Sequence, residues 1–212
     1  MSTSHPPQQA RSRETLARIK AAAEELMAQQ SFEKITVQQI VKKAKTTTGS
    51  FYARFEDKDA LFDTLHTEHV EETVRTMKSR LQELPEAALP ERVSVIVQMI
   101  GFAFHRRPGL MRSGTLAFWT NPNRGKQDQL AEEAHREFGK QIRRIGQELV
   151  KVAAGLGHPE PKEAGFFALK IALSASRHHY LFSDERTVLK ISSKKFERQL
   201  TKMVLTYLSH GE

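Results

Sequence analysis

The sequence contains no cysteine among its 212 residues. This absence excludes disulfide bonds, thiolate metal sites and cysteine nucleophiles, and it fits the reducing cytoplasm, where we expect the protein to be located. Long apolar runs are missing too, since the longest, over residues 93–104, is interrupted by Ser94, Gln98 and Gly101. A membrane-spanning helix needs roughly 20 apolar residues, so we expect no membrane partner.

Sequence signatures of the common enzyme classes are absent as well. The HExxH, GxGxxG, P-loop and GxSxG motifs do not occur. His66 and His69 lie one turn apart, and Glu132 and His135 form one Glu-x-x-His pair, whereas a di-iron bundle needs two such pairs and two further carboxylates. We therefore expect no enzyme activity, no catalytic residue, no metal and no cofactor. A metal-binding helical bundle or enzyme remains an alternative.

Positive charge exceeds negative charge in this chain. The 33 Lys and Arg residues outnumber the 25 Asp and Glu residues, which gives a formal net charge of +8. An anionic partner is therefore worth testing, although the excess alone does not distinguish nucleic acid from a membrane surface. A basic module that binds a membrane surface or another protein is thus a second alternative, and the basic helix expected after Ser192 is its best candidate.

Apolar residues recur every three or four positions along most of the chain, as is typical of amphipathic helices. Period-two alternation is absent, so the predicted fold class is all-α. We expect a disordered arm over residues 1–12, a small helical domain over residues 13–60 and a larger helical domain over residues 61–212. Within the larger domain, helices are predicted over residues 91–105, 108–119, 126–156, 161–182 and 192–209.

Residues 36–55 carry the pattern of two short helices joined by a tight turn. Thr36 can N-cap the first of them, and Phe51 and Phe55, one turn apart, can anchor the second. Two such helices, supported by a longer first helix, form a helix-turn-helix whose second helix lies in the major groove of DNA. Its outer face carries short hydroxyls that can reach base edges and a glycine that permits close approach of the backbone, namely Thr47, Thr48, Ser50 and Gly49.

The segment FEKITVQQIVKKAKTTTGSFYARFEDKDALF, within residues 14–62, resembles the N-terminal domain of the TetR family of bacterial transcriptional regulators. The most specific part of the match comprises Gly49, the Phe51-Tyr52 pair, Phe55, Lys58 and Leu61. The resemblance implies an N-terminal three-helix DNA-binding domain that contains the helix-turn-helix. It also implies that the larger helical domain binds an effector and forms a dimer.

The resemblance implies phosphate contacts for Thr36, Tyr52 and Lys58, and DNA contacts along the recognition helix. Where relatives usually have Gly-Val in the turn, this chain has Lys45-Thr46, so the turn lacks a residue that takes positive φ at no cost. Lys45 is expected to add a phosphate contact, and Arg54 is either a DNA contact or a solvated surface charge. The expected DNA-binding residues are Thr36, Lys45, Thr47, Thr48, Gly49, Ser50, Tyr52, Arg54 and Lys58.

Two apolar segments near the C-terminus predict a homodimer. Residues 166–175 are apolar around almost the whole helix, so one face can pack within its own subunit while another needs cover from a second subunit. The last helix adds another apolar stripe, and two helices from each subunit would form a four-helix interface. A monomer with two ordinary core helices is the alternative. The expected interface residues are Phe166, Phe167, Leu169, Ile171, Leu173, Phe196, Leu200, Met203 and Tyr207.

A small-molecule effector is implied by the resemblance, without its identity. Phe102, His105 and Trp119 lie on or near apolar faces and are the pocket candidates, with ordinary core packing as the alternative for each. Together these expectations describe a homodimeric, ligand-responsive regulator of transcription that binds an operator with partial two-fold symmetry. Repression, and release of the operator by an effector, are implied by the resemblance alone.

Overall fold

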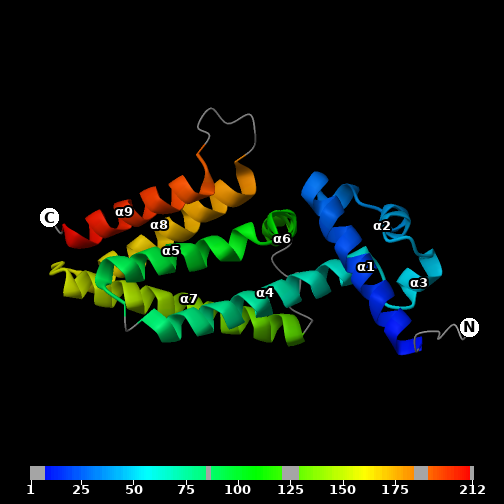
Figure 1. Cartoon of the computed structure of the whole chain (residues 1–212), viewed down its shortest axis with the longest axis horizontal. Helices are drawn as coiled ribbons and strands as arrows, with labels where there is room; N and C mark the ends of the chain where they lie inside the picture. Colours follow the sequence, from blue (N-terminus) through cyan, green and yellow to red (C-terminus); the bar gives the residue numbers. More distant parts are fainter. Residues whose placement is uncertain (1–7, 85–86, 121–128, 184–190, 211–212) are drawn as a thin grey trace, which may run out of the picture. The chain divides into compact units, whose positions relative to one another are not determined.

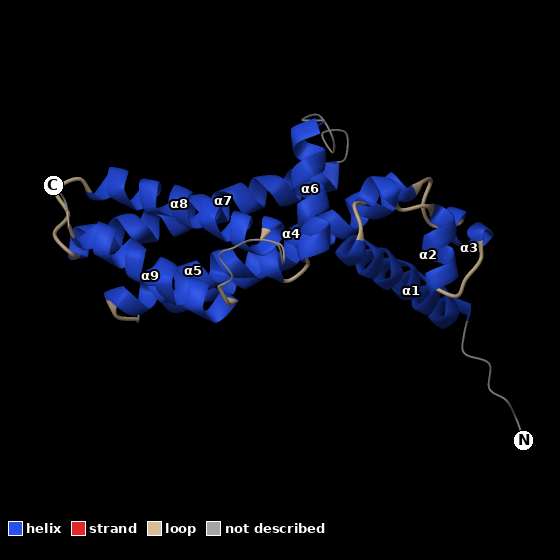
Figure 2. Cartoon of the chain, turned by 90° about the horizontal axis from the view of Figure 1, so that it is seen from above, coloured by secondary structure: helices blue, strands red, loops and turns tan. Residues whose placement is uncertain are grey.

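The computed structural model describes residues 8–84, 87–120, 129–183 and 191–210, without the side chains of residues 8, 117–120 and 129. Every element in these ranges is helical, which confirms the predicted all-α class (Figure 2). The contacts within the chain define two compact units. One unit contains residues 1–68 and 109–125, and the other contains residues 69–108 and 126–212.

The first unit contains α1 (Gln8–Gln29), the short 3-10 helix η1 (Phe32–Lys34), α2 (Val37–Lys43), α3 (Thr48–Tyr52) and the start of α4 (Lys58–Glu83). Helix α1 packs against α2, and α2 packs against α3 (Figure 1). Their facing side chains share one apolar core, whose fully buried members include Ile19, Met27, Ile40, Phe51 and Leu61. The fold of the helix-turn-helix is thus held by a core of its own.

Helix α1 begins earlier than the sequence pattern predicts. Residues 8–12 are helical, whereas the sequence predicts a disordered arm over residues 1–12; residues 1–7 lie outside the described ranges. The apolar periodicity begins only at Leu16, because the first turns of α1 are exposed on all sides. The spacing of apolar residues therefore could not predict these first turns of α1.

The first unit also includes most of α6 (Pro108–Thr120), which the predicted boundary at residue 60 assigns to the second domain. Leu110 is buried in the same core as Met27. The Nη2 atom of Arg112 donates to the carbonyl oxygen of Met27 at 3.3 Å. A Cβ atom built on Gly109 would lie only 2.4 Å from that same oxygen. The backbone of α6 is thus in direct contact with the end of α1.

The second unit consists of α5 (Leu89–His105), α7 (Gln129–Gly155), α8 (Pro161–Phe182) and α9 (Ser193–Ser209), together with residues 69–83 of α4. Small side chains at four-residue spacing, Ala164, Ala168 and Ala172, form the buried face of α8. A Cβ atom on Gly165 would lie 2.5 Å from the backbone nitrogen of Val150, so α7 and α8 approach each other at backbone distance. The bounds of these four helices agree with the predicted ranges to within three residues.

Neither a membrane-spanning segment nor a metal site is found in the described part of the chain. None of its helices is long and apolar enough to cross a bilayer. No group of three or more His, Asp or Glu side chains in these ranges has an arrangement that could hold a metal ion.

Candidate nucleic-acid interface

Helix α3 is anchored to the first unit by two buried aromatic rings. Phe51 is fully buried and Phe55 is 7% exposed, and their ring centroids lie 5.6 Å apart. A helix of five residues is too short to be stable by its own hydrogen bonds, so this packing determines its position. One face of α3 is therefore fixed in the core while the other is presented to solvent.

The outer face of α3 is small, polar and exposed. Thr48 and Gly49 are exposed, and Tyr52 is 55% exposed with its ring edge-on to Phe51. Thr47 N-caps the helix, because its Oγ1 accepts the Ser50 N–H at 3.1 Å. The Thr47 hydroxyl also donates to Ser50 Oγ at 3.1 Å. The structure thus brings together the four residues predicted on this face and Tyr52. The Thr47 hydroxyl caps the start of the helix.

The turn between α2 and α3 is a Schellman motif with a lysine at the position that favours glycine. The backbone of Lys45 has a φ of 50°, in the left-handed region. The Thr46 N–H donates to the Val41 carbonyl at 3.0 Å, and the Lys45 N–H donates to the Lys42 carbonyl at 3.3 Å. The turn therefore keeps its hydrogen bonds although Lys45 is not a glycine, at a backbone cost of about 1–2 kcal/mol.

Lys45→Gly is expected to raise the free energy of unfolding by about 0.5–1 kcal/mol, because glycine adopts positive φ without steric strain. Urea denaturation of both proteins measures the difference. Lys42→Gly is the matched control, since Lys42 is exposed within α2 and glycine there should destabilise by up to about 1 kcal/mol. Equal destabilisation by both substitutions would contradict strain at Lys45.

Thr36 N-caps α2 through a reciprocal capping box. Its Oγ1 accepts the Gln39 N–H at 3.2 Å, and Gln39 Oε1 accepts the Thr36 N–H at 2.8 Å. The cap at Thr36 was predicted and its partner Gln39 was not, although the Thr-x-x-Gln spacing is a known signal for this motif. Thr36 remains exposed at the start of the helix-turn-helix.

Lys58 points into the protein, which corrects its expected outward orientation toward phosphate. Its Nζ donates to the carbonyl oxygens of Phe32, Glu33 and Ile35 at 3.2, 3.1 and 3.2 Å. It also lies 4.7 Å from the centroid of the Phe32 ring. An ammonium group has three N–H donors, and all three are directed at backbone carbonyls here. Lys58 therefore ties the start of α4 to the segment that leads into α2.

Arg54 joins the end of α3 to the start of α1. Its Nη1 donates to the Ser50 carbonyl at 2.6 Å, and its Nη2 donates to Ser12 Oγ at 3.0 Å and to the Ser12 carbonyl at 3.3 Å. The side chain is therefore a structural link rather than a solvated surface charge. Ser12 was not predicted, because a contact across 42 residues leaves no local signal in the sequence.

The two pocket candidates with described side chains line one cavity in the second unit. Phe102 and His105 border a space of about 250 Å³ between α4, α5 and α9, and their rings meet edge to face at 5.9 Å. Trp119 lies in α6, and its side chain falls outside the described part of the structure.

The predicted interface residues fall into three groups. Phe166, Phe167, Met203 and Tyr207 are 37–49% exposed on α8 and α9. Ile171, Leu173 and Phe196 are partly buried. Leu169 and Leu200 are at most 5% exposed within the single chain. These two leucines therefore belong to the core of their own subunit, which corrects their assignment to the interface.

Comparison with known proteins agrees with this arrangement. Residues 19–65 match the family described as bacterial regulatory proteins, tetR family. A bacterial regulatory protein of the tetR family from Rhodococcus RHA1 is 16% identical, with a TM-score of 0.60 over 93% of this chain and 98% of that chain. A TetR-family transcriptional regulator from Streptomyces coelicolor is 18% identical, with a TM-score of 0.57 over 93% and 97%. No curated protein matches the chain.

The solved structures, at these identities, establish the fold alone. The family match is more specific, because it spans the helix-turn-helix together with Lys58 and Leu61. That range also contains the capped α2, the Schellman turn and the exposed face of α3. Residues 19–65 therefore form a DNA-binding domain that matches the tetR family, and the protein is a DNA-binding transcriptional regulator.

Proposed function

We propose that the protein is a homodimeric repressor that binds an operator with partial two-fold symmetry and releases it when a small effector binds. The observation that carries the DNA-binding part is the exposed polar face of α3, held in place by buried Phe51 and Phe55. Thr48, Gly49 and Ser50 would face base edges. Thr36, Lys45 and Tyr52 would contact phosphates on either side. No specific observation in the described residues favours the metal-binding or membrane-surface alternatives.

Selection of duplexes from a random pool at near-physiological salt tests this proposal. We expect an inverted repeat with strong preference over scrambled DNA, because two α3 helices related by two-fold symmetry read two half-sites. The affinity for the selected duplex should fall steeply with salt, since phosphate contacts release counterions. Binding that is weak and independent of sequence would contradict a sequence-specific regulator.

Gly49→Ala separates the role of Gly49 in DNA binding from any role in the fold. In the protein alone, the single atom near a Cβ built on Gly49 is Thr47 Oγ1 at 3.9 Å. We expect unchanged or slightly higher stability, by up to about 1 kcal/mol, since alanine is the better helix former. We also expect at least roughly tenfold weaker binding to the selected duplex, because the methyl group would enter the closest approach to DNA.

Fluorescence anisotropy and thermal denaturation measure these two effects in the same preparations. Thr48→Ala is the companion variant, because it removes a base-reading hydroxyl without adding bulk and should change sequence preference. A stable Gly49→Ala variant that binds the selected duplex as tightly as the wild type would show that the backbone does not approach DNA at this position.

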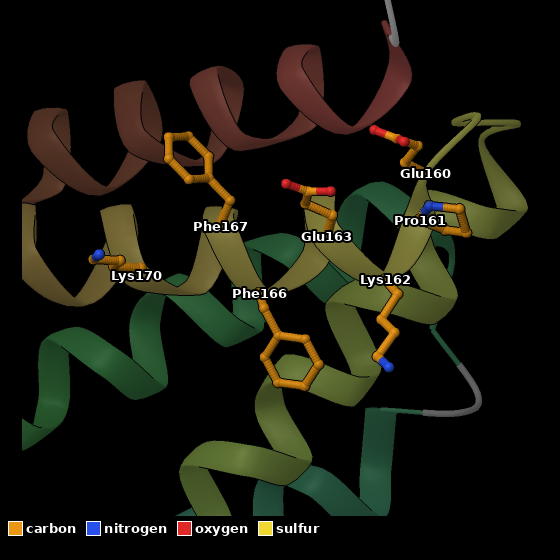
Figure 3. Close-up of a pocket in the computed structure, with 7 residues that line it drawn as sticks. All are labelled: Glu160, Pro161, Lys162, Glu163, Phe166, Phe167 and Lys170. Carbon is orange, nitrogen blue, oxygen red and sulfur yellow. The ribbon is translucent and has the colours of Figure 1, made fainter.

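The dimeric part of the proposal is supported by exposed apolar side chains on α8 and α9. Figure 3 shows Phe166 and Phe167 pointing away from opposite sides of α8. Both residues line a surface hollow of about 660 Å³. The Phe167 ring lies 5.5 Å from that of Tyr207 on α9. An exposed apolar patch of this kind usually marks an interface. A second copy of the chain would cover it.

Sedimentation velocity tests the dimer. Phe167→Glu places a charge in this apolar patch and is expected to shift the protein to the monomer and abolish cooperative operator binding. Gln82→Glu, at an exposed position of α4, adds the same charge elsewhere and should leave the dimer intact. A wild-type protein that sediments as a monomer would rule out this part of the proposal.

A further inference from the structure

The cavity that contains Phe102 and His105 has opposite charges in its wall. Arg80 projects from α4 and Glu197 from α9, and both line the same space of about 250 Å³. Among the described residues, neither side chain has an ion-pair partner, and the two do not pair with each other. Two opposite charges that line one small cavity without pairing are suited to a ligand that carries the complementary pair.

The carboxylate of Glu197 is held in place by a neutral group. The Tyr180 hydroxyl donates to Glu197 Oε1 at 2.6 Å, and burial together with this carboxylate raises the pKa of Tyr180. A Cβ on Gly101 would lie 3.2 Å from the Tyr180 hydroxyl and 3.4 Å from Glu197 Oε1, so the glycine leaves room for the pair. The Tyr180 contact orients the carboxylate without neutralising its charge.

Aromatic rings surround the carboxylate side of the cavity. The His105 ring lies 5.4 Å from the Tyr180 ring and meets Phe102 edge to face. Aromatic faces beside a carboxylate favour an ammonium group and also pack against an apolar body. Val95 and Met99 complete the apolar part of the wall.

The face of α4 that carries Arg80 continues as a polar row into the interior of the second unit. Thr76, Thr73 and His69 precede Arg80 at three- and four-residue spacing, and Thr76 also lines the cavity. His69 and Thr73 are each 2% exposed, and neither His69 Nδ1 nor Thr73 Oγ1 has a hydrogen-bond partner. His69 Nε2 lies 3.0 Å from the Ala103 carbonyl and donates to it, so Nδ1 is an acceptor. Buried polar atoms without partners are rare, and these two lie on α4 behind Thr76, outside the lining of the cavity.

We propose that this cavity binds a small zwitterion of the amino-acid type, with Arg80 facing its carboxylate, Glu197 facing its ammonium group, and Phe102 and His105 packing against its apolar side chain. The volume lies just below the usual range for ligand pockets, which limits the ligand to a small molecule. The role of this molecule as the effector rests on the proposed function, whereas its binding does not.

Isothermal titration calorimetry on the full chain without DNA tests the binding. The probes are L-phenylalanine and L-leucine, with phenethylamine and 3-phenylpropanoate as analogues of phenylalanine that each lack one charge. We expect at least one amino acid to bind, and phenylalanine to bind at least roughly tenfold more tightly than both analogues, since each charged contact contributes about that factor. Absence of binding by both amino acids, or equal binding of an analogue, overturns the proposal.

Two charge-neutralising variants assign the contacts. Glu197→Gln keeps an acceptor for the Tyr180 hydroxyl, and Arg80→Gln keeps a polar side chain of moderate length, so circular dichroism should show unchanged helix content. Each is expected to weaken amino-acid binding at least roughly tenfold. Arg75→Gln, exposed on α4 outside the cavity, is the matched control and should bind as the wild type does. Unchanged affinity in both cavity variants overturns the proposal.

Operator binding is measured separately, so the two proposals can fail independently. The amino acid that binds is added to the complex of the protein with its selected duplex. Dissociation of the duplex supports the effector role. Binding of the amino acid with no effect on the duplex would leave the site in place and overturn its role as the effector site.

Discussion

Gly109→Ala is expected to lower the free energy of unfolding by about 1–3 kcal/mol, although alanine is the better helix former. A Cβ at this position would lie 2.4 Å from the Met27 carbonyl oxygen and 2.7 Å from the Ala28 nitrogen. Backbone atoms cannot rotate aside as a side chain can, so α6 must move away from α1. That movement weakens the burial of Leu110 and the hydrogen bond from Arg112 to Met27.

Gly139→Ala is the matched control for this prediction. No atom lies within 4 Å of a Cβ at Gly139 in α7, so alanine there should stabilise by up to about 1 kcal/mol through helix propensity alone. Urea denaturation followed by circular dichroism gives both values. Because Gly109 belongs to the same unit as the helix-turn-helix, we also expect its substitution to weaken operator binding. A stabilising effect of Gly109→Ala would show that α6 does not contact α1 this closely.

The helices and the exposed polar face of α3 were predictable from the sequence because their signals are local. Apolar spacing located α5 to α9 to within three residues. The N-cap at Thr36 also follows from residue type and position. Lys45 occupies the turn position where the family usually has glycine, so the resemblance predicted that this residue needs a positive φ. The backbone of Lys45 has a φ of 50°.

The misplaced residues depend on contacts that are distant in the sequence. Lys58 reaches carbonyls 23 to 26 residues away, and Arg54 reaches Ser12 across 42 residues. Arg112 of α6 reaches Met27 across 85 residues. A surface cation and an internal structural link have the same local pattern, so sequence spacing cannot separate them. Leu169 and Leu200 show the same limit, since a helix that is apolar on most sides does not reveal which side its own subunit covers.

Lys58→Met is expected to lower the free energy of unfolding by about 2–4 kcal/mol. The variant keeps most of the apolar stem that packs near Phe32 but loses the donors to three carbonyls. Hydrogen bonds to a charged group contribute about 1.5–3 kcal/mol each, and water restores part of this where the carbonyls are exposed. Urea denaturation measures the loss.

The salt dependence of operator binding distinguishes this structural role from a phosphate contact. Each neutralised phosphate adds about 0.9 to the slope of log affinity against log salt concentration. Because the Lys58 ammonium is bonded internally, we expect Lys58→Met to weaken binding with an unchanged slope, measured below the unfolding transition. Lys45→Met keeps the side-chain bulk and the strained φ of an exposed lysine and should reduce the slope by about 0.9 for each phosphate that the lysine neutralises in the wild type. A reduction of the same size in Lys58→Met would mean that the ammonium leaves the three carbonyls and binds phosphate in the DNA complex.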